Sequence, residues 1–175
     1  YPYDLEKARA LLDGAGFHDA DNDGIRETAE GEKLSYMLLT SPNYVREADY
    51  VAGQARKVGI ILTVQTLPVP TLDPMLKEGR FRLAINGHGG IGGDPDTLRK
   101  NFCEGWLMYA GGYKNSEFTE LAERQVAECD PLRRRVMTDR MQEIIAEDLP
   151  VIPLWYPSIY FVYDPAVLDG WFYTP

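Results

Sequence analysis

RLAINGHGGIGGDPDTLRKNF, residues 82–102, is the stretch that says most about how this chain folds. The apolar run Leu83–Ile85 predicts a strand, and five glycines lie within the seven residues 87–93. Asp94-Pro95 then opens a predicted helix, because Asp suits the capping position and Pro suits the first helical turn. In open α/β sheets, the region beyond the carboxyl ends of the strands is where ligands bind. The glycine loop is therefore the first candidate for a binding site.

The residues before this stretch predict two more strands and two helical crossovers. Residues 34–39 alternate and residues 60–67 are β-branched, which is typical of strands. Apolar positions at helical spacing predict helices over residues 43–58 and 71–78. With a third strand over residues 82–86, the predicted order is β-α-β-α-β, and the helical crossovers imply parallel strands with right-handed connections. The glycine loop then lies at the carboxyl end of the third strand.

Further helices are predicted toward both ends of the chain. Asp4 is the predicted cap of a helix that ends near Gly14. Ser116 is predicted to cap one longer helix and Asp130-Pro131 to begin another, and both carry apolar residues at helical spacing. Two prolines confine the aromatic tail, residues 151–163, to an edge or irregular strand. We expect an α/β fold with a mixed sheet flanked by helices, in which residues 1–175 form a single domain.

Composition excludes several classes of partner. The 175 residues are 45% hydrophobic, which is enough to bury a core. The net charge is −9, from 18 basic and 27 acidic residues, and no basic stripe runs along the sequence. Because nucleic acids and anionic membranes are bound through clustered basic charge, we expect neither as a partner. No run approaches the roughly 18 apolar residues of a membrane span.

The two cysteines, Cys103 and Cys129, lack the spacing of a redox or metal motif. They form a disulfide if the protein is exported to an oxidising compartment, or they remain two buried thiols. The sequence leaves both alternatives open.

The loop at residues 19–30, DADNDGIRETAE, carries a second pattern with chemical meaning. It matches D-x-[DN]-x-[DN]-G-x₅-E, which spaces hard oxygen ligands around Ca²⁺. The predicted ligands are the carboxylates of Asp19, Asp21, Asp23 and Glu30 and the carbonyl of Ile25. Asp-Asn-Asp-Gly is also good turn chemistry, so a solvated acidic turn is the alternative. If Ca²⁺ binds, we expect it to stabilise the loop rather than to signal.

The glycine loop allows three interpretations. It matches G-x-G-x-x-G, but it follows the third strand, and Asp94 would oppose a pyrophosphate at the helix N-terminus, so a dinucleotide site is disfavoured. The glycines alternatively serve only a sharp turn. The interpretation that we favour is a loop lining a ligand cleft, with the predicted contact residues His88, Gly89, Gly90, Ile91 and Asp94.

Signatures of catalysis are sparse in this sequence. It contains no G-x-S-x-G, P-loop or H-E-x-x-H pattern, and His18 and His88 are isolated from one another. An enzyme would have to use His88 with Asp94 and Asp96, but helix capping is the expected task of Asp94. We therefore expect no enzyme activity, no catalytic residues and no cofactor other than structural Ca²⁺.

Six short segments, taken in chain order, form one recognisable set. They are residues 3–17 (YDLEKARALLDGAGF), 21–27 (DNDGIRE), 57–60 (KVGI), 87–96 (GHGGIGGDPD), 112–118 (GYKNSEF) and 147–154 (EDLPVIPL). With these segments, the chain resembles from end to end the C-terminal lobe of family 5 extracellular solute-binding proteins, the peptide/nickel receptors of ABC importers.

This resemblance implies a fold, a function and partners. The fold is a periplasmic-binding-protein-like lobe of type II, cluster C. The function is capture of a small solute or peptide between this lobe and the N-terminal lobe of the same protein, followed by delivery to an ABC permease in the membrane. The implied location is periplasmic or extracellular, with lipoprotein anchoring of the full-length protein as an option.

Two departures from the family pattern leave the cargo open. Peptide-binding members place an acid between a Trp and the D-P pair to hold the peptide's ammonium group, whereas here His88 replaces the Trp and residues 90–92 are Gly-Ile-Gly. The nickel-site histidine of part of the family has no counterpart in residues 101–113. A peptide in another pose, a sugar or another small polar solute all remain candidates.

A different class of function is the alternative to transport. The chain would then be a calcium-stapled module that recognises a protein partner through an exposed aromatic patch, formed by Trp155, Tyr156, Tyr160, Phe161 and Tyr163.

Overall fold

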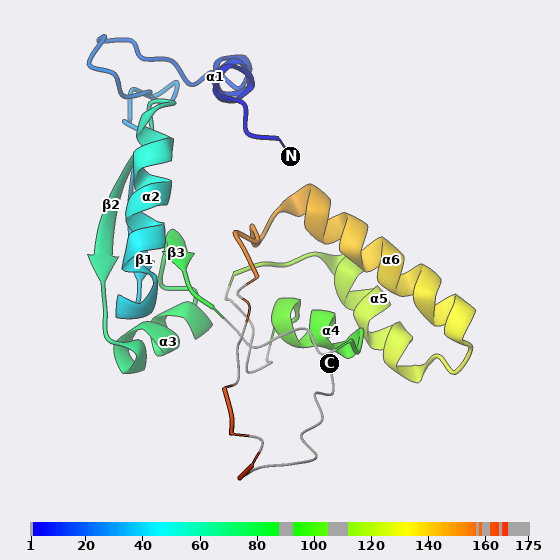
Figure 1. The fold of residues 1–175 in the computed structure, drawn as a ribbon. Coiled ribbons are helices and arrows are strands. Elements are labelled where there is room, and N and C mark those ends of the chain that lie inside the picture. The colour runs from blue at the N-terminus through cyan, green and yellow to red at the C-terminus, as the bar shows by residue number, and fades with distance from the viewer. Residues whose placement is uncertain are drawn as a thin grey trace. The chain divides into compact units, whose positions relative to one another are not determined.

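The structure is a computed structural model that describes residues 2–87, 93–104, 112–156, 158, 162–164 and 166–167. These residues divide into two compact units. The N-terminal unit contains residues 2–87 with Gly112, and the C-terminal unit contains the other described residues. Figure 1 draws both units. A single domain over residues 1–175 stays a prediction.

The N-terminal unit is an α/β structure built on a parallel sheet (Figure 1). Its elements are α1 (Leu5–Gly14), β1 (Ser35–Thr40), the 3₁₀ helix η1 (Pro42–Tyr44), α2 (Val45–Arg56), β2 (Ile61–Thr66), α3 (Val69–Lys77) and β3 (Leu83–Ile85). The strand order is β2-β1-β3, and β1 pairs in parallel with both neighbours. This confirms the expected β-α-β-α-β order and the α/β class. The described strands are all parallel, whereas a mixed sheet was expected.

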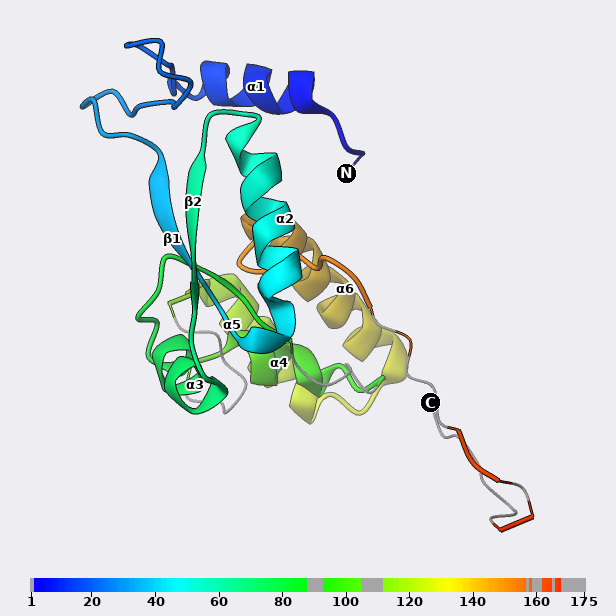
Figure 2. The same ribbon diagram turned by 60° about the vertical axis from the view of Figure 1, so that its left-hand side comes forward.

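Consecutive residues of β1 face opposite sides of the sheet, and this gives the N-terminal unit its three layers. Leu38 packs with Ala48 of α2 on one face, and Leu39 packs with Leu72 of α3 on the other. All four side chains are buried. Figure 2 shows α2 running along the sheet beside β1 and β2. A strand covered by helices on both faces carries apolar side chains on both faces. In β1, the neighbouring residues Leu38 and Leu39 near its carboxyl end show this pattern.

The start of the chain is attached to the turn between α2 and β2. Asp4 caps α1, as expected, by accepting a backbone N–H from the first turn. Arg9 of α1 donates to the carbonyl of Lys57 over 2.9 Å. Gly59 ends the turn with a φ of +85°, and a Cβ there would lie 2.7 Å from Cγ of Arg26. Both the backbone conformation and the close approach of Arg26 therefore favour glycine at this position.

The C-terminal unit is helical in its described part. Its elements are α4 (Asp96–Phe102), α5 (Ser116–Ala127) and α6 (Pro131–Asp148). Its buried core comprises Cys103, Phe118, Ala122, Met141 and Ile144. Around this core, the rings of Phe102, Tyr113 and Phe118 meet edge to face, with centroids 5.9–6.2 Å apart. Edge-to-face packing fixes how α4 and α5 approach one another.

Two helix starts differ slightly from the expected ones. The cap of α5 is Asn115 rather than Ser116, since the Asn115 side chain accepts the N–H of Phe118 over 3.0 Å. Asn115 also donates to Asp148 over 2.8 Å, and this second bond holds it in the capping position. α4 begins at Asp96, so Pro95 lies just before the helix rather than in its first turn. Asp130 caps α6 as expected.

The tail differs from the expected edge strand. Residues 151–156, 158, 162 and 163 contain no strand, and residues 157 and 159–161 lie outside the described part of the chain. Prolines in the tail lack the N–H that a sheet ladder needs. Several apolar side chains of the C-terminal unit are exposed rather than packed inward, among them Val126, Leu132, Val136 and Ile152.

Both cysteines are free thiols, and they differ in exposure. Cys103 is buried in the core of the C-terminal unit, whereas Cys129 is exposed between α5 and α6. The structure therefore contains no disulfide between them, and only one of the two thiols is buried. Among the helices of the described residues, none combines the length and apolar character that crossing a membrane demands.

Candidate functional site

The carboxyl ends of the three parallel strands lie side by side, because Thr40 of β1 is in register with Thr66 of β2 and Ile85 of β3. Thr40 and Ser41 are both buried at this edge. Thr40 donates its hydroxyl to the carbonyl of Ile85 over 3.2 Å. Among the described residues, the Ser41 hydroxyl has no hydrogen-bond partner. A buried polar group without a partner is costly, and the carboxyl edge of a parallel sheet is where ligands of α/β proteins bind.

The first residue of the glycine loop is packed against an aromatic ring. Gly87 follows β3, and a Cβ at this position would lie 2.8 Å from Cζ of Tyr44 and closer still to its hydroxyl oxygen. Glycine is needed here because Tyr44 approaches the main chain. The main chain at the start of the loop is therefore in contact with Tyr44 of η1. No pattern in the sequence predicts this contact.

Most of the predicted ligand contacts lie outside the described residues: His88, Gly89, Gly90 and Ile91. Asp94 is described, and its Oδ1 accepts the N–H of Asp96 over 2.9 Å and a bond from Arg134 over 3.0 Å. The bond from Asp96 and then the pairing with Arg134 lower the pKa of Asp94. Its carboxylate is thus held as an anion at the start of α4. Its role in ligand contact stays a prediction.

Asp96 is bound in the same way and offers no acid for catalysis. Its carboxylate accepts from Arg99 over 2.6 Å and pairs with Lys100 over 2.9 Å. The hydrogen bond from Arg99 is the main reason that the pKa of Asp96 is lowered. Because both Asp94 and Asp96 are paired with cations, the geometry gives neither of them the raised pKa of a general acid.

The acidic loop brings most of its predicted metal ligands together. Carboxylate oxygens of Asp19, Asp21, Asp23 and Glu27 all lie within 4.8 Å of one another. Glu30, the predicted fourth carboxylate, is exposed and is not part of this group. A tight turn explains the difference, because the carbonyl of Glu32 accepts the N–H of Thr28 and the intervening turn carries Glu30 outward. Ile25, the predicted carbonyl ligand, donates its N–H to Asp23 over 2.9 Å.

Lys33 is the cation that pairs with this loop, and it lies outside the predicted ligand pattern of residues 19–30. Its Nζ pairs with Asp21 over 3.0 Å and also with Asp23. The hydrogen bond from Lys33 is the main reason that the pKa of Asp23 is lowered, and Asp23 in turn raises the pKa of Lys33. An isolated antiparallel bridge between Glu27 and Lys33 places this ammonium among the acids.

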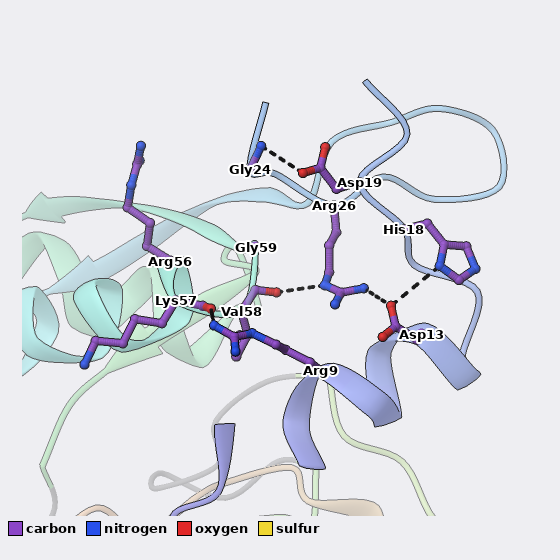
Figure 3. Close-up of a pocket in the computed structure, with 10 residues that line it drawn as sticks. All are labelled: Arg9, Asp13, His18, Asp19, Gly24, Arg26, Arg56, Lys57, Val58 and Gly59. Carbon is purple, nitrogen blue, oxygen red and sulfur yellow. Dashed lines mark hydrogen bonds and ion pairs between the residues drawn. The ribbon is translucent and has the colours of Figure 1, made fainter. Parts of the chain in front are cut away.

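A surface pocket of about 400 Å³ lies beside the acidic loop, between α1 and the α2–β2 turn. Figure 3 shows Arg26 at its centre, donating Nε to the carbonyl of Val58 over 2.9 Å and pairing with Asp13. The bond from Arg26 lowers the pKa of Asp13. His18, which also lines the pocket, has Nδ1 3.6 Å from Asp13. The polar groups of the pocket mainly pair with one another. These bonds connect α1, the acidic loop and the α2–β2 turn within the N-terminal unit.

Residues 1–107 match the family model described as "Bacterial extracellular solute-binding proteins, family 5 Middle". This chain belongs to that family. The match covers the whole three-stranded sheet, the acidic loop and the glycine loop. The resemblance inferred from six short segments is therefore confirmed for the family as a whole.

Individual relatives agree with this assignment. Di/tripeptide-binding protein 4 of Pseudomonas aeruginosa is 29% identical over 93% of this chain and 30% of its own length. The oligopeptide-binding protein AppA of Bacillus subtilis, solved with a nonapeptide, has a TM-score of 0.70 and 27% identity over 85% of this chain and 30% of its own. A mannohexaose-bound oligopeptide-binding protein of Thermotoga maritima has a TM-score of 0.69 and 25% identity, over 90% of this chain and 31% of its own.

The chain spans about a third of the length of these relatives. The fold of a family 5 solute-binding protein is therefore established for the part of such a protein that this chain represents. The alternative interpretation, a calcium-stapled module that recognises a protein partner, finds no support among these relatives.

Proposed function

We propose that this chain is the C-terminal lobe of a two-lobed receptor that captures a solute and delivers it to the permease of an ABC importer. The observation that carries the proposal is the family match over residues 1–107, which includes the candidate binding edge of the sheet. In this proposal, residues 1–175 act as one domain, and a missing N-terminal lobe supplies the other wall of the cleft. The receptor works outside the cytoplasmic membrane, free or anchored by a lipid.

The proposed binding wall begins at the carboxyl edge of the sheet. Ser41 lies at this edge with a buried hydroxyl that has no partner among residues 2–87 and the other described segments. Gly87 leads from the same edge into residues 88–91, His-Gly-Gly-Ile, of which the two glycines carry no side chain. The predicted contact residue Asp94 follows this segment in the sequence. Such a wall suits a ligand with several hydrogen-bonding groups.

The cargo that fits this wall is a peptide or another small polar solute. Relatives named for di- and tripeptides and for oligopeptides favour a peptide, and the relative solved with mannohexaose favours a sugar. Residues 87–93 contain no acid to hold a free ammonium group. We therefore propose that the cargo is held mainly by hydrogen bonds to the main chain and to His88.

Binding would be coupled to closure of the two lobes. Contacts that the solute makes with both lobes exist only in the closed state, so the solute shifts the population toward closure. The closed form is then the one that a permease distinguishes from the open form. No bond of the solute is made or broken in this cycle.

The test uses the full-length receptor that contains this chain. Native mass spectrometry of the purified protein identifies a bound solute, and calorimetry with di-, tri- and oligopeptides and with oligosaccharides measures its affinity. Small-angle scattering is expected to show a more compact receptor with the solute than without it. A receptor that carries no solute and neither binds nor closes with any of these compounds would overturn the proposal.

Matched histidine variants locate the site within this lobe. His88→Ala is expected to weaken solute binding about tenfold, the effect of one good hydrogen bond. His18→Ala is the control, since His18 lies at the pocket beside the acidic loop and should leave affinity unchanged. The isolated chain is expected to bind weakly, because half of the contacts are missing. Submicromolar binding by the isolated chain would contradict a cleft shared between two lobes.

A further inference from the structure

The four carboxylates of the acidic loop are held in position by the backbone of the loop itself. Asp19 accepts the N–H of Gly24 over 2.9 Å, and Asp23 accepts the N–H of Ile25 over 2.9 Å. Glu27 uses Oε2 to accept the N–H of Ala20 over 2.8 Å. Asp21 accepts the N–H of Asp23 with Oδ1 over 3.2 Å. Backbone N–H groups of the loop thus hold at least one oxygen of each carboxylate.

Both oxygens of Asp19 accept N–H groups of the loop, whereas the second oxygens of Asp21, Asp23 and Glu27 converge on one point. Oδ2 of Asp21 lies 3.0 Å from Nζ of Lys33, Oδ2 of Asp23 contacts the same nitrogen, and Oε1 of Glu27 lies 3.9 Å from it. Three acidic side chains therefore present their second oxygen to a single positive charge. A positive charge at the centre of several carboxylate oxygens is the arrangement of a cation site.

Glu27 supplies an independent sign that a ligand belongs at this point. Its side chain is 8% exposed, and within the part of the chain that the structure describes its Oε1 has no hydrogen-bond partner. A buried carboxylate oxygen without a partner costs free energy, and the 3.9 Å gap to Lys33 is too long for a hydrogen bond. One ammonium group also leaves most of the charge of four clustered carboxylates uncompensated.

We propose that Asp19, Asp21, Asp23 and Glu27 form a Ca²⁺ site, in which the Lys33 ammonium occupies the position of the ion and is displaced when the ion binds. Ca²⁺ is the expected ion because all the ligand atoms are hard oxygens carried by an irregular loop, and Ca²⁺ tolerates flexible geometry where Mg²⁺ demands an octahedron. Ile25 remains the predicted carbonyl ligand. This site is independent of the proposed transport function.

The position of the site explains what the ion would do. The loop connects α1 to β1, and Arg26 within it bonds to α1 and to the α2–β2 turn. An ion that fixes the loop therefore stabilises the attachment of α1 to the sheet. When the ion concentration exceeds Kd, the free energy by which the ion stabilises the folded state rises with the logarithm of the ratio of ion concentration to Kd.

The test is calorimetric titration of the EDTA-treated chain with CaCl₂, together with thermal melting in CaCl₂, MgCl₂ and NaCl at equal ionic strength. We expect one Ca²⁺ per chain and a Tm that rises by several degrees in excess CaCl₂, more than in MgCl₂ or NaCl. Equal Tm values in CaCl₂ and NaCl would overturn the proposal, because screening alone would then account for the effect.

Three variants identify the ligands. Lys33→Met removes the competing ammonium while keeping a long side chain, and it is expected to tighten Ca²⁺ binding by about tenfold or more. Glu27→Gln is expected to weaken binding by at least about tenfold. Glu30→Gln is the matched control, since Glu30 lies outside the cluster and should leave binding unchanged.

The outcomes separate this site from the simpler alternatives. Lys33→Met keeps the test valid even if Glu27→Gln fails to fold, because tighter binding cannot arise from unfolding. Absence of Ca²⁺ binding in both the unmodified chain and Lys33→Met would show that Lys33 is a permanent structural counter-ion. Loss of binding in Glu30→Gln but not in Glu27→Gln would show that the sequence pattern, rather than the cluster, defines the ligands.

Discussion

Gly87 and Tyr44 approach so closely that the ring of Tyr44 occupies the space a side chain at position 87 would need. A Cβ at Gly87 would lie 2.8 Å from Cζ of Tyr44 and nearer still to its hydroxyl oxygen. Tyr44 ends η1 and Gly87 follows β3, so this contact ties together two connections that leave the same edge of the sheet. The entry into the glycine loop is thereby set by packing.

Gly87→Ala is expected to destabilise the chain by about 1–3 kcal/mol, because the added methyl group forces the Tyr44 ring or the β3 end to move. Chemical denaturation monitored by circular dichroism measures this loss. In a Tyr44→Ala background the cost should fall by at least about 0.5 kcal/mol, which a double-mutant cycle detects. Gly53→Ala is the control, since nothing lies within 4 Å of its Cβ position in α2 and alanine favours helix. Additive effects of the two substitutions would contradict the packing explanation.

Arg26→Ala is expected to reduce stability by about 3 kcal/mol, since it removes charged hydrogen bonds to Val58, Phe17 and Asp13 from a largely buried side chain. The free energy of unfolding in urea is the measurement. Arg56→Ala serves as control, because Arg56 lines the same pocket but is exposed, and a change within about 0.5 kcal/mol is expected. Equal decreases in the free energy of unfolding in the two variants would show that the bonds of Arg26 do not hold α1 to the α2–β2 turn.

The hydrogen bonds that the Asp148 carboxylate accepts in the C-terminal unit are expected to weaken at acidic pH. It accepts from Tyr113 over 2.7 Å and from Asn115 over 2.8 Å, and these bonds, led by that of Tyr113, lower its pKa. A lowered folded-state pKa means that the contribution is present above the unfolded pKa of about 3.9 and is lost as pH falls through the folded value.

Asp148→Asn should therefore be less stable than the unmodified chain at pH 6, and the difference should shrink below about pH 4. Urea unfolding at a series of pH values measures this difference. Tyr113→Phe removes the leading hydrogen bond and should show part of the same pH dependence. A stability difference that stays constant from pH 6 to about pH 2.5 would contradict the assigned cause.

The two thiols should react at very different rates. Cys129 is exposed, whereas Cys103 is buried and desolvation raises its pKa, so little of it is thiolate at neutral pH. A chromogenic disulfide reagent is expected to modify one thiol per chain quickly under native conditions and the second only in denaturant. Cys129→Ser should abolish the fast phase and keep the slow one. Two fast thiols, or none, would contradict this difference in burial.

The local pattern of the sequence was sufficient for most of the scaffold. Apolar periodicity located the strands and helices of the β-α-β-α-β unit, because alternation and helical spacing depend only on neighbouring residues. Asp4 and Asp130 were recognised as caps for the same reason. The acidic pattern also predicted that Asp19, Asp21 and Asp23 lie together, because a short loop that bends sharply at Gly24 keeps residues two positions apart close in space.

Only the tertiary structure decided which distant partners complete these local features. The turn after Glu27 reverses the chain, so Glu27 and Lys33 join the acids while Glu30 points to solvent. Arg134 reaches Asp94 across forty residues of sequence. The spacing of residues along a chain fixes what lies within a turn or two, whereas contacts between separate elements depend on how their buried faces pack. The local order of residues along the chain thus determined its scaffold, and packing determined which side chains share a site.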